Sequence, residues 1–214
     1  MLAQIRRGGV ETSKGFLFEL SGGDVSLDFA NTIDCRPLKE CRDLIPDFPK
    51  FLSWARQTKI ISRKEEQKLL EKAEAHYAEA ESARRDAIRL RELLFEIFSA
   101  VADKKRIPET SISKWNEWIS KASEHYELQP SATGFRWALK SEHSDFRSIL
   151  WPIVHASAEL LTGSDASRIR KCASKSCDWL FLDRSKRGNR RWCDMTVCGN
   201  REKARRYYHK SKGE

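Results

Sequence analysis

The chain has 214 residues, 40% of them hydrophobic, and a formal net charge of +9. This composition supports a packed core and excludes a globally disordered protein. No run of about 18 apolar residues occurs, which excludes a membrane-spanning helix. The positive charge lies at one end, because residues 168–214 hold 15 Lys/Arg and 5 Asp/Glu (+10), whereas residues 1–167 hold 25 and 26 (−1). Such an asymmetry favours a polyanionic partner for the C-terminal end.

The first half of the chain reads mainly as helices with one short strand. Residues 16–20 predict a strand that ends at Gly22 and Gly23, and residues 25–33 predict a helix. Asp47 is placed to start the next helix. Ser62, followed by Glu65 three residues later, has the pattern of a capping box.

The second half continues this pattern as far as residue 163. Apolar spacing predicts a helix over residues 83–101 and another that opens at Ser111 or Ser113. Residues 135–139 predict a strand. The last helix is expected over residues 145–161, with a kink or break at Pro152.

The predicted fold class is therefore mainly α (α+β). A helical N-terminal domain with a small β element, residues 1–165, is expected to precede a separate zinc finger, residues 166–214. Because residues 1–163 are nearly neutral and carry their own apolar helix faces, we expect them to fold without the finger.

Four cysteines near the C-terminus have the spacing of a metal site. Cys172 and Cys177 are separated by four residues, as are Cys193 and Cys198, with fifteen residues between the pairs. No export signal is expected in residues 1–10, so we predict a cytoplasmic protein in which such cysteines bind metal rather than form disulfides. Four thiolates fill a tetrahedral zinc shell and leave no position for water, which predicts one structural zinc ion.

The segment between the cysteine pairs predicts a treble-clef or ribbon-like layout. Residues 179–182 and 190–192 are expected to be strands joined by a polar turn, and residues 200–210 a helix. Cys35 and Cys41, outside this segment, are expected to be buried small apolar residues.

Basic residues flank the predicted metal site on both sides and suggest a surface for nucleic acid. Those on the turn are expected to bind phosphates without much sequence preference, and those at the start of the helix to read bases, chiefly Asn200, Arg201 and Arg205. Glu202 and Arg206 are expected to pair with each other. The charge does not distinguish DNA from RNA. The full predicted set is Arg184, Lys186, Arg187, Arg190, Arg191, Asn200, Arg201, Lys203, Arg205 and Arg206.

A polar group in the N-terminal domain suggests a small-molecule site. Asp28, Asn31 and Thr32 interrupt an apolar segment, and Arg36 is available for an acidic ligand. The alternative is that these side chains cap helices and form buried hydrogen bonds.

The residues at both ends of the chain resemble a known pair of domains. Cys198-Gly199-Asn200-Arg201, with the cysteine spacing upstream, resembles the CGNR zinc finger. Residues 27–32, followed by Arg36, resemble the signature of the ABATE domain, which precedes that finger in its family. The resemblance implies a bacterial stress-induced transcription regulator.

The sequence thus favours a regulator that binds DNA through a zinc finger, with the N-terminal domain sensing an effector or directing assembly. One alternative is a zinc-dependent module that docks an acidic protein partner, and another is an RNA-binding protein. A third is an enzyme with a pocket around Asp28 and Asn31, but no P-loop, dinucleotide-binding glycine pattern, nucleophile elbow or paired-histidine zinc motif occurs, so we do not expect an enzyme.

Overall fold

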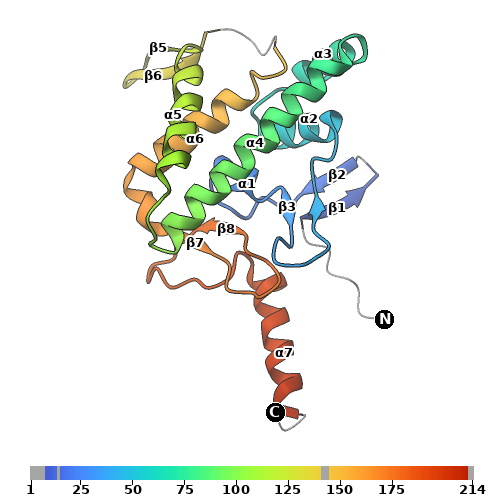
Figure 1. Cartoon of the computed structure of the whole chain (residues 1–214), viewed down its shortest axis with the longest axis vertical. Helices are drawn as coiled ribbons and strands as arrows, with labels where there is room; N and C mark the ends of the chain where they lie inside the picture. The colour runs from blue at the N-terminus through green and yellow to red at the C-terminus, as the bar shows by residue number, and fades with distance from the viewer. Residues whose placement is uncertain (1–7, 14, 141–144, 212–214) are drawn as a thin grey trace.

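The computed structural model describes residues 8–13, 15–140 and 145–211. The first seven residues, on which the expected lack of an export signal partly rests, lie outside these ranges. Within the described residues, no helix is both long and apolar enough to cross a membrane. Helices make up most of the body, the finger strands lie at one end of it, and the C-terminal helix projects away from it (Figure 1).

The N-terminal part is mainly helical with small antiparallel strand pairs, which confirms the predicted fold class. The pairs are β1 with β2, β3 with β4, and β5 with β6. The elements in chain order are β1 (Gly9–Thr12), β2 (Gly15–Phe18), α1 (Val25–Ala30), β3 (Ile33–Asp34), β4 (Arg42–Asp43), α2 (Phe48–Gln57), α3 (Arg63–Ala75), α4 (Tyr77–Ala102), α5 (Glu109–Ser123), β5 (Tyr126–Ser131), β6 (Gly134–Leu139) and α6 (Leu150–Thr162).

Helix α4 is the element around which the others pack. Its buried residues recur at helical spacing, among them Ala83, Ala87, Leu90 and Leu94, and they form one apolar face. This helix contacts α1, α2, α3 and α5 of the N-terminal part and also β7 (Ile169–Lys171) and β8 (Leu180–Leu182) of the finger. It therefore packs against both parts of the chain.

The predicted helix caps at Asp47 and Ser62 are confirmed. Asp47 accepts a hydrogen bond from the backbone N–H of Lys50, and Ser62 and Glu65 form both hydrogen bonds of a capping box. By contrast, α5 begins at Glu109, ahead of the predicted serines, and Ser111 is buried inside its first turn.

The last helix of the N-terminal part is shorter than predicted. Helix α6 begins at Leu150 instead of residue 145, which makes Pro152 its third residue. A proline in the first turn costs no helical hydrogen bond, so the expected kink is not needed. Gly163 ends the helix as expected.

The finger has a different hairpin from the one predicted. After a short 3-10 helix η1 (Ser164–Arg168), strand β7 pairs antiparallel with β8, and Cys172 donates from its backbone N–H to the Trp179 carbonyl. Residues 190–192 are not a strand. The first cysteine pair therefore lies in the turn of the β7–β8 hairpin, and residues 183–192 form a loop. A π-helical turn η2 (Met195–Gly199) then leads into α7 (Asn200–Ser211).

One hydrophobic core runs across the boundary between the two parts. It includes Leu27 and Phe29 of α1 together with Leu180 and Phe181 of β8, all fully buried. The independent folding of residues 1–163 stays a prediction, but removing the finger would expose this shared core.

Asn31 joins the finger to the N-terminal part through two buried hydrogen bonds. Its Nδ2 donates to the Leu180 carbonyl and its Oδ1 accepts from the Leu180 N–H, both at 2.8 Å. Beside this pair, the Trp179 indole N–H donates to the Ile33 carbonyl at 2.9 Å, and the Leu182 N–H donates to the Gly22 carbonyl at 2.8 Å. Helix α1 ends at Ala30, before the predicted residue 33, and the chain beyond Asn31 forms β3.

We predict that Asn31→Ala lowers the free energy of unfolding by about 2–4 kcal/mol, because it leaves the buried N–H and carbonyl of Leu180 without partners. Urea titration of the zinc-loaded protein, followed by circular dichroism, measures the change. Asn116→Ala, at an exposed position of α5, is the matched control and should change stability by less than about 0.5 kcal/mol. Equal effects of the two substitutions would contradict the structural role of Asn31.

Candidate metal centre and nucleic-acid interface

The four cysteines predicted as ligands come together in one buried cluster. The Sγ atoms of Cys172, Cys177, Cys193 and Cys198 all lie within 4.8 Å of one another, and each residue is at most 4% exposed. The β7–β8 turn supplies Cys172 and Cys177, and the turn that leads into α7 supplies Cys193 and Cys198.

The spacing of the sulfur atoms fits zinc. A tetrahedral ion with Zn–S bonds of about 2.3 Å places its sulfurs about 3.8 Å apart. The Sγ of Cys193 lies 3.6 Å from that of Cys177 and 3.7 Å from that of Cys198. Four thiols fill the shell without room for water, so the site holds one structural zinc ion.

Local backbone geometry sets each pair of ligands. Asp178, directly after Cys177, has a φ of 65°, which turns the chain from the first pair back into β8. In the second pair, Asp194 caps the π-helical turn: its side chain accepts from the Val197 N–H at 2.8 Å, and its carbonyl accepts from the Cys198 N–H at 3.0 Å.

A buried carboxylate holds the loop between β8 and the second cysteine pair. Asp183 is fully buried, and it accepts from the backbone N–H groups of Ser185 and Arg190 at 2.9 and 2.8 Å. These two bonds fix the ends of a basic loop that we define as residues 184–191.

Arg190 has a structural place within this basic loop. Its Nε donates to the Trp192 carbonyl at 2.8 Å, its Nη2 donates to the Cys193 carbonyl, and its guanidinium lies 4.5 Å from the centre of the Phe181 ring. These contacts tether the guanidinium to the protein, although Arg190 itself is exposed. The role of Arg190 as a nucleic-acid contact stays a prediction, and these internal hydrogen bonds count against it.

The other basic side chains of the loop point outward. Lys186, Arg187 and Arg191 are exposed, with Arg191 near the Trp192 ring. Arg184 is also exposed, and it donates to the Gly23 carbonyl at 3.3 Å. These four residues remain available for phosphates.

Helix α7 has an inward and an outward face near its start. Glu202 is buried, accepts from the Ser174 hydroxyl at 3.1 Å and pairs with Arg205 at 2.9 Å. The expected pair of Glu202 with the Arg206 side chain is not formed, because Arg206 donates to the Glu202 backbone carbonyl instead. Arg201 is half-buried, with its Nη1 out of contact with solvent.

The outward face of α7 carries the remaining candidates. At 100° per residue, Asn200, Lys203 and Tyr207 lie on the side opposite Glu202, and all three are exposed. Arg206 is also exposed, but it lies nearer to Glu202 than to Lys203 around the helix axis. The structure thus separates Asn200 and Lys203 from Arg201 and Arg205, which are half-buried.

The four residues predicted to bind a small molecule all have partners inside the protein. Asn31 binds Leu180, and Asp28 accepts from the Gly22 N–H at 2.8 Å. Thr32 donates to the Phe29 carbonyl, and Arg36 pairs with Glu92 and donates to the Ala30 carbonyl. An effector there would have to displace these bonds, so the ligand site stays a prediction.

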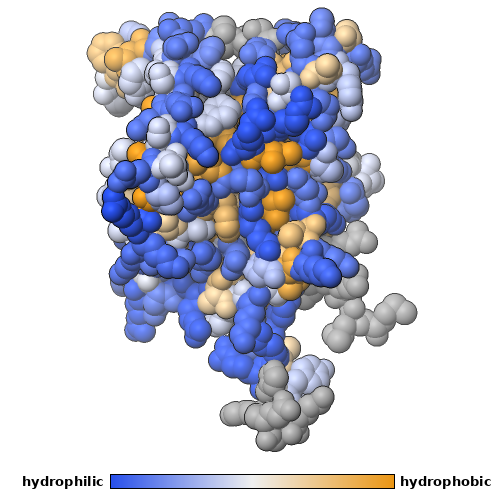
Figure 2. Space-filling model, viewed as in Figure 1, coloured by the Kyte–Doolittle hydropathy of each residue, from blue (hydrophilic) through white to orange (hydrophobic). Residues whose placement is uncertain are grey.

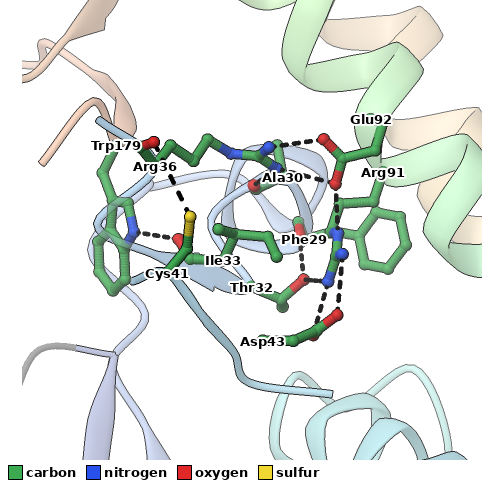
Figure 3. Close-up of polar contacts among 10 residues, drawn as sticks. All are labelled: Phe29, Ala30, Thr32, Ile33, Arg36, Cys41, Asp43, Arg91, Glu92 and Trp179. Carbon is green, nitrogen blue, oxygen red and sulfur yellow. Dashed lines mark hydrogen bonds and ion pairs between the residues drawn. The ribbon is translucent and has the colours of Figure 1, made fainter. Parts of the chain in front are cut away.

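Thr32 and Arg36 belong to an ion-pair network on α4 (Figure 3). Arg91, only 2% exposed, binds both carboxylate oxygens of Asp43, at 2.8 and 3.0 Å, and also contacts Glu92 and Thr32. Burial alone would raise the pKa values of Asp43 and Glu92, but the arginines beside them hold both values below their usual range. The network holds the β3–β4 hairpin (residues 32–43) against α4, and the Ile33 carbonyl of β3 accepts from Trp179.

The same segment contains the other two cysteines, and the expectation that both are buried is wrong. Cys35 is half-buried with a φ of 59°, and Cys41 is exposed. They lie in the turns between two very short strands, where no core can cover them.

Family models match both parts of the chain. The model described as Putative stress-induced transcription regulator (ABATE) matches residues 23–164, more than half of the chain. The chain belongs to the ABATE family. The model described as CGNR zinc finger matches residues 168–211, in the order that the sequence predicted. No curated protein matched the sequence.

Membership of the ABATE family confirms the resemblance and agrees with the zinc centre. Neither matched family is an enzyme family. Sequence reasoning missed three structural roles: Asn31 in joining the parts, Arg190 in holding its loop, and Glu202 in fixing α7. Asn31 and Arg190 bind backbone atoms, and Glu202 binds Ser174, 28 positions away, so these contacts leave no pattern in the sequence.

We predict that the protein, purified without added zinc, contains one zinc ion per chain, and that Cys193→Ser loses most of it and unfolds the module, since metal binding and folding are coupled in such fingers. Elemental analysis and circular dichroism measure both effects. Cys41→Ser, at an exposed cysteine outside the cluster, should keep the full metal content. Retention of one zinc by Cys193→Ser would show that the ligand set is wrong.

A second prediction concerns Asp28, whose pKa is raised from 3.8 to about 7, mainly by burial and despite the hydrogen bond from Gly22. The folded protein thus holds a proton that the unfolded chain releases, and the stability from protonated Asp28 is lost as pH rises through 7. We therefore expect the free energy of unfolding of Asp28→Asn, minus that of the native protein, to increase from pH 5 to 7 and to level off above about pH 8. Urea titrations of both proteins measure this difference, in which other titrating groups cancel. A difference that is constant with pH would exclude the shift.

Proposed function

We propose that this protein is a transcription regulator of the cytoplasm that binds duplex DNA through its zinc module. The observation that carries the proposal is the position of the charge. The excess of +10 in residues 168–214 becomes +8 when four thiolates bind one divalent zinc ion. Most of the exposed basic residues in this region lie on two elements, the basic loop and α7, and Arg168 and Lys175 are exposed outside them.

The shape of the module supports insertion into a groove. Helix α7 projects from the body (Figure 1), and the surface in its region is hydrophilic (Figure 2). A projecting helix can enter the major groove, while a loop beside it contacts the phosphate backbone. Asn200 and Lys203 lie on its outward face, where an amide can bind adenine and an ammonium guanine.

The proposed division of roles follows from which side chains are free. Arg184, Lys186, Arg187 and Arg191 would supply affinity through phosphates, and Asn200 and Lys203 would supply sequence preference. Arg201 and Arg205, first expected to read bases, face the module and would instead hold the helix. The ABATE domain would serve as the sensing or assembly part.

We predict that Arg187→Ala weakens binding to preferred and random duplexes about equally and lowers the slope of log K against log salt by about 0.9. We predict that Asn200→Ala costs roughly 1–3 kcal/mol on the preferred site and little on random DNA. Fluorescence anisotropy over a salt series measures both effects, after the preferred site is selected from a random pool at about 150 mM salt.

Lys64→Ala, at an exposed lysine of α3, is the control and should change neither quantity. Equal losses on both duplexes for Asn200→Ala would make α7 a phosphate contact only. Tighter binding to duplex RNA than to DNA would favour the RNA alternative. If no nucleic acid binds at all, the alternative of an acidic protein partner becomes the better function.

A further inference from the structure

The hairpin of β5 and β6 presents an apolar face that its own domain covers only in part. The register pairs Leu128 with Trp137 and Pro130 with Phe135, so these side chains share one face. Phe135 is 73% exposed, Leu128 57% and Trp137 53%. Hydrophobic side chains gather at this hairpin on the molecular surface (Figure 2). Exposed aromatic residues in such a group mark a binding surface more often than an accident of folding.

Helix α6 supplies the opposite wall. The His155 ring stacks on Tyr126, with centroids 4.5 Å apart at 25°, and lies 6.2 Å from Trp137 at 66°. Glu159, one helical turn from His155, places its carboxylate 3.5 Å from the imidazole Nδ1. Rings from the hairpin and from α6 therefore meet at an angle, with a carboxylate at their edge.

These walls enclose an open cavity of about 540 Å³, lined by Tyr126, Leu128, Phe135, Arg136, Trp137, Pro152, His155 and Glu159. A smaller cavity of about 200 Å³ adjoins it and shares Tyr126, Trp137 and His155. The larger space matches the size of ordinary small-molecule sites.

The electrostatics of the cavity favour a cation. Aromatic faces are electron-rich and attract positive charge, and Glu159 adds a full negative charge. Glu159 reaches the rings through His155, which pairs with its carboxylate and stacks on Tyr126. Burial, with a smaller contribution from Glu159, also raises the pKa of Tyr126 to about 12. Arg136 also lines the cavity, but its backbone position is on the opposite face of the hairpin and its guanidinium donates to Gln129 at 2.8 Å, whereas the Glu159 carboxylate lies beside the rings of Tyr126 and His155.

We propose that this cavity binds a small organic cation of the alkylated ammonium class. The rings of Tyr126, Phe135 and Trp137 would contact the alkyl groups, and Glu159 would neutralise the charge. An anion would be repelled by Glu159, and a neutral apolar ligand would desolvate that carboxylate without replacing its water. The site lies outside the zinc module, so its test does not depend on DNA binding.

The test compares two ligands of one shape. Choline carries a quaternary nitrogen, and 3,3-dimethylbutan-1-ol has a neutral carbon in its place. Each is titrated into the full-length, zinc-loaded protein at constant ionic strength, with NMR detection of the tryptophan indole signals. We expect choline to shift the Trp137 signal with a Kd near 1 mM, which corresponds to about −4.1 kcal/mol. The neutral isostere should bind at least about tenfold more weakly.

Two substitutions and one control locate the site. Trp137→Leu removes the main ring, and we expect it to weaken choline binding about tenfold. Glu159→Gln keeps the shape of a side chain that is 67% exposed, and it should weaken the binding of choline but not that of the isostere. Glu127→Gln, on the opposite face of the hairpin, should leave binding unchanged.

Three outcomes would overturn the proposal. Equal binding of both ligands would mean a plain apolar surface. Absence of binding by either ligand to the folded protein would remove the site. Indole shifts that depend on protein concentration and not on choline would assign this face to contacts between copies of the chain.

Discussion

The hydrogen bonds between Asn31 and Leu180 are the interaction on which the rest of the molecule depends. A single carboxamide satisfies both backbone groups of a β8 residue inside the core, as a neighbouring strand would. Because these polar groups are buried, water cannot replace the two hydrogen bonds, and breaking them would lower the free energy of unfolding considerably. The zinc module therefore packs against the body through buried contacts, and α7 is joined to the body through that module.

Zinc provides the second constraint, and it acts locally. The module has little core of its own, so four sulfurs hold the β7–β8 hairpin to the turn before α7. Asp183 and Arg190 then hold the loop between them through backbone groups. Once the metal and these contacts have fixed the chain, Lys186, Arg187, Asn200 and Lys203 remain exposed.

The link between the two parts also suggests how a signal could travel. The β3–β4 hairpin is held to α4 by the bond of Arg91 to Asp43, and it contacts the finger where Trp179 donates to the Ile33 carbonyl. Helix α6 packs against α1, which carries the residues next to Asn31. A ligand bound over α6 would thus act on elements that contact β8 directly, without a long chain of intermediates.

The sequence by itself determined the mainly helical class, the caps at Asp47 and Ser62 and the four zinc ligands, because each depends on residues close together in the chain. Thiol spacing in particular is a local rule that the metal's geometry imposes. The sequence did not predict strand β7, the place of Pro152 in the first turn of α6, or the end of α1 at Ala30. At these points the competing local patterns are nearly equal.

Only the tertiary structure decided what the polar residues do. Asn31 meets a partner 149 positions away, and no periodicity records a contact of that range. Arginines of the module look alike in the sequence, yet Arg190 and Arg205 bind within the protein while Arg187 faces solvent. That difference depends on which face of a loop or helix the packed core covers, and packing is a property of the whole chain.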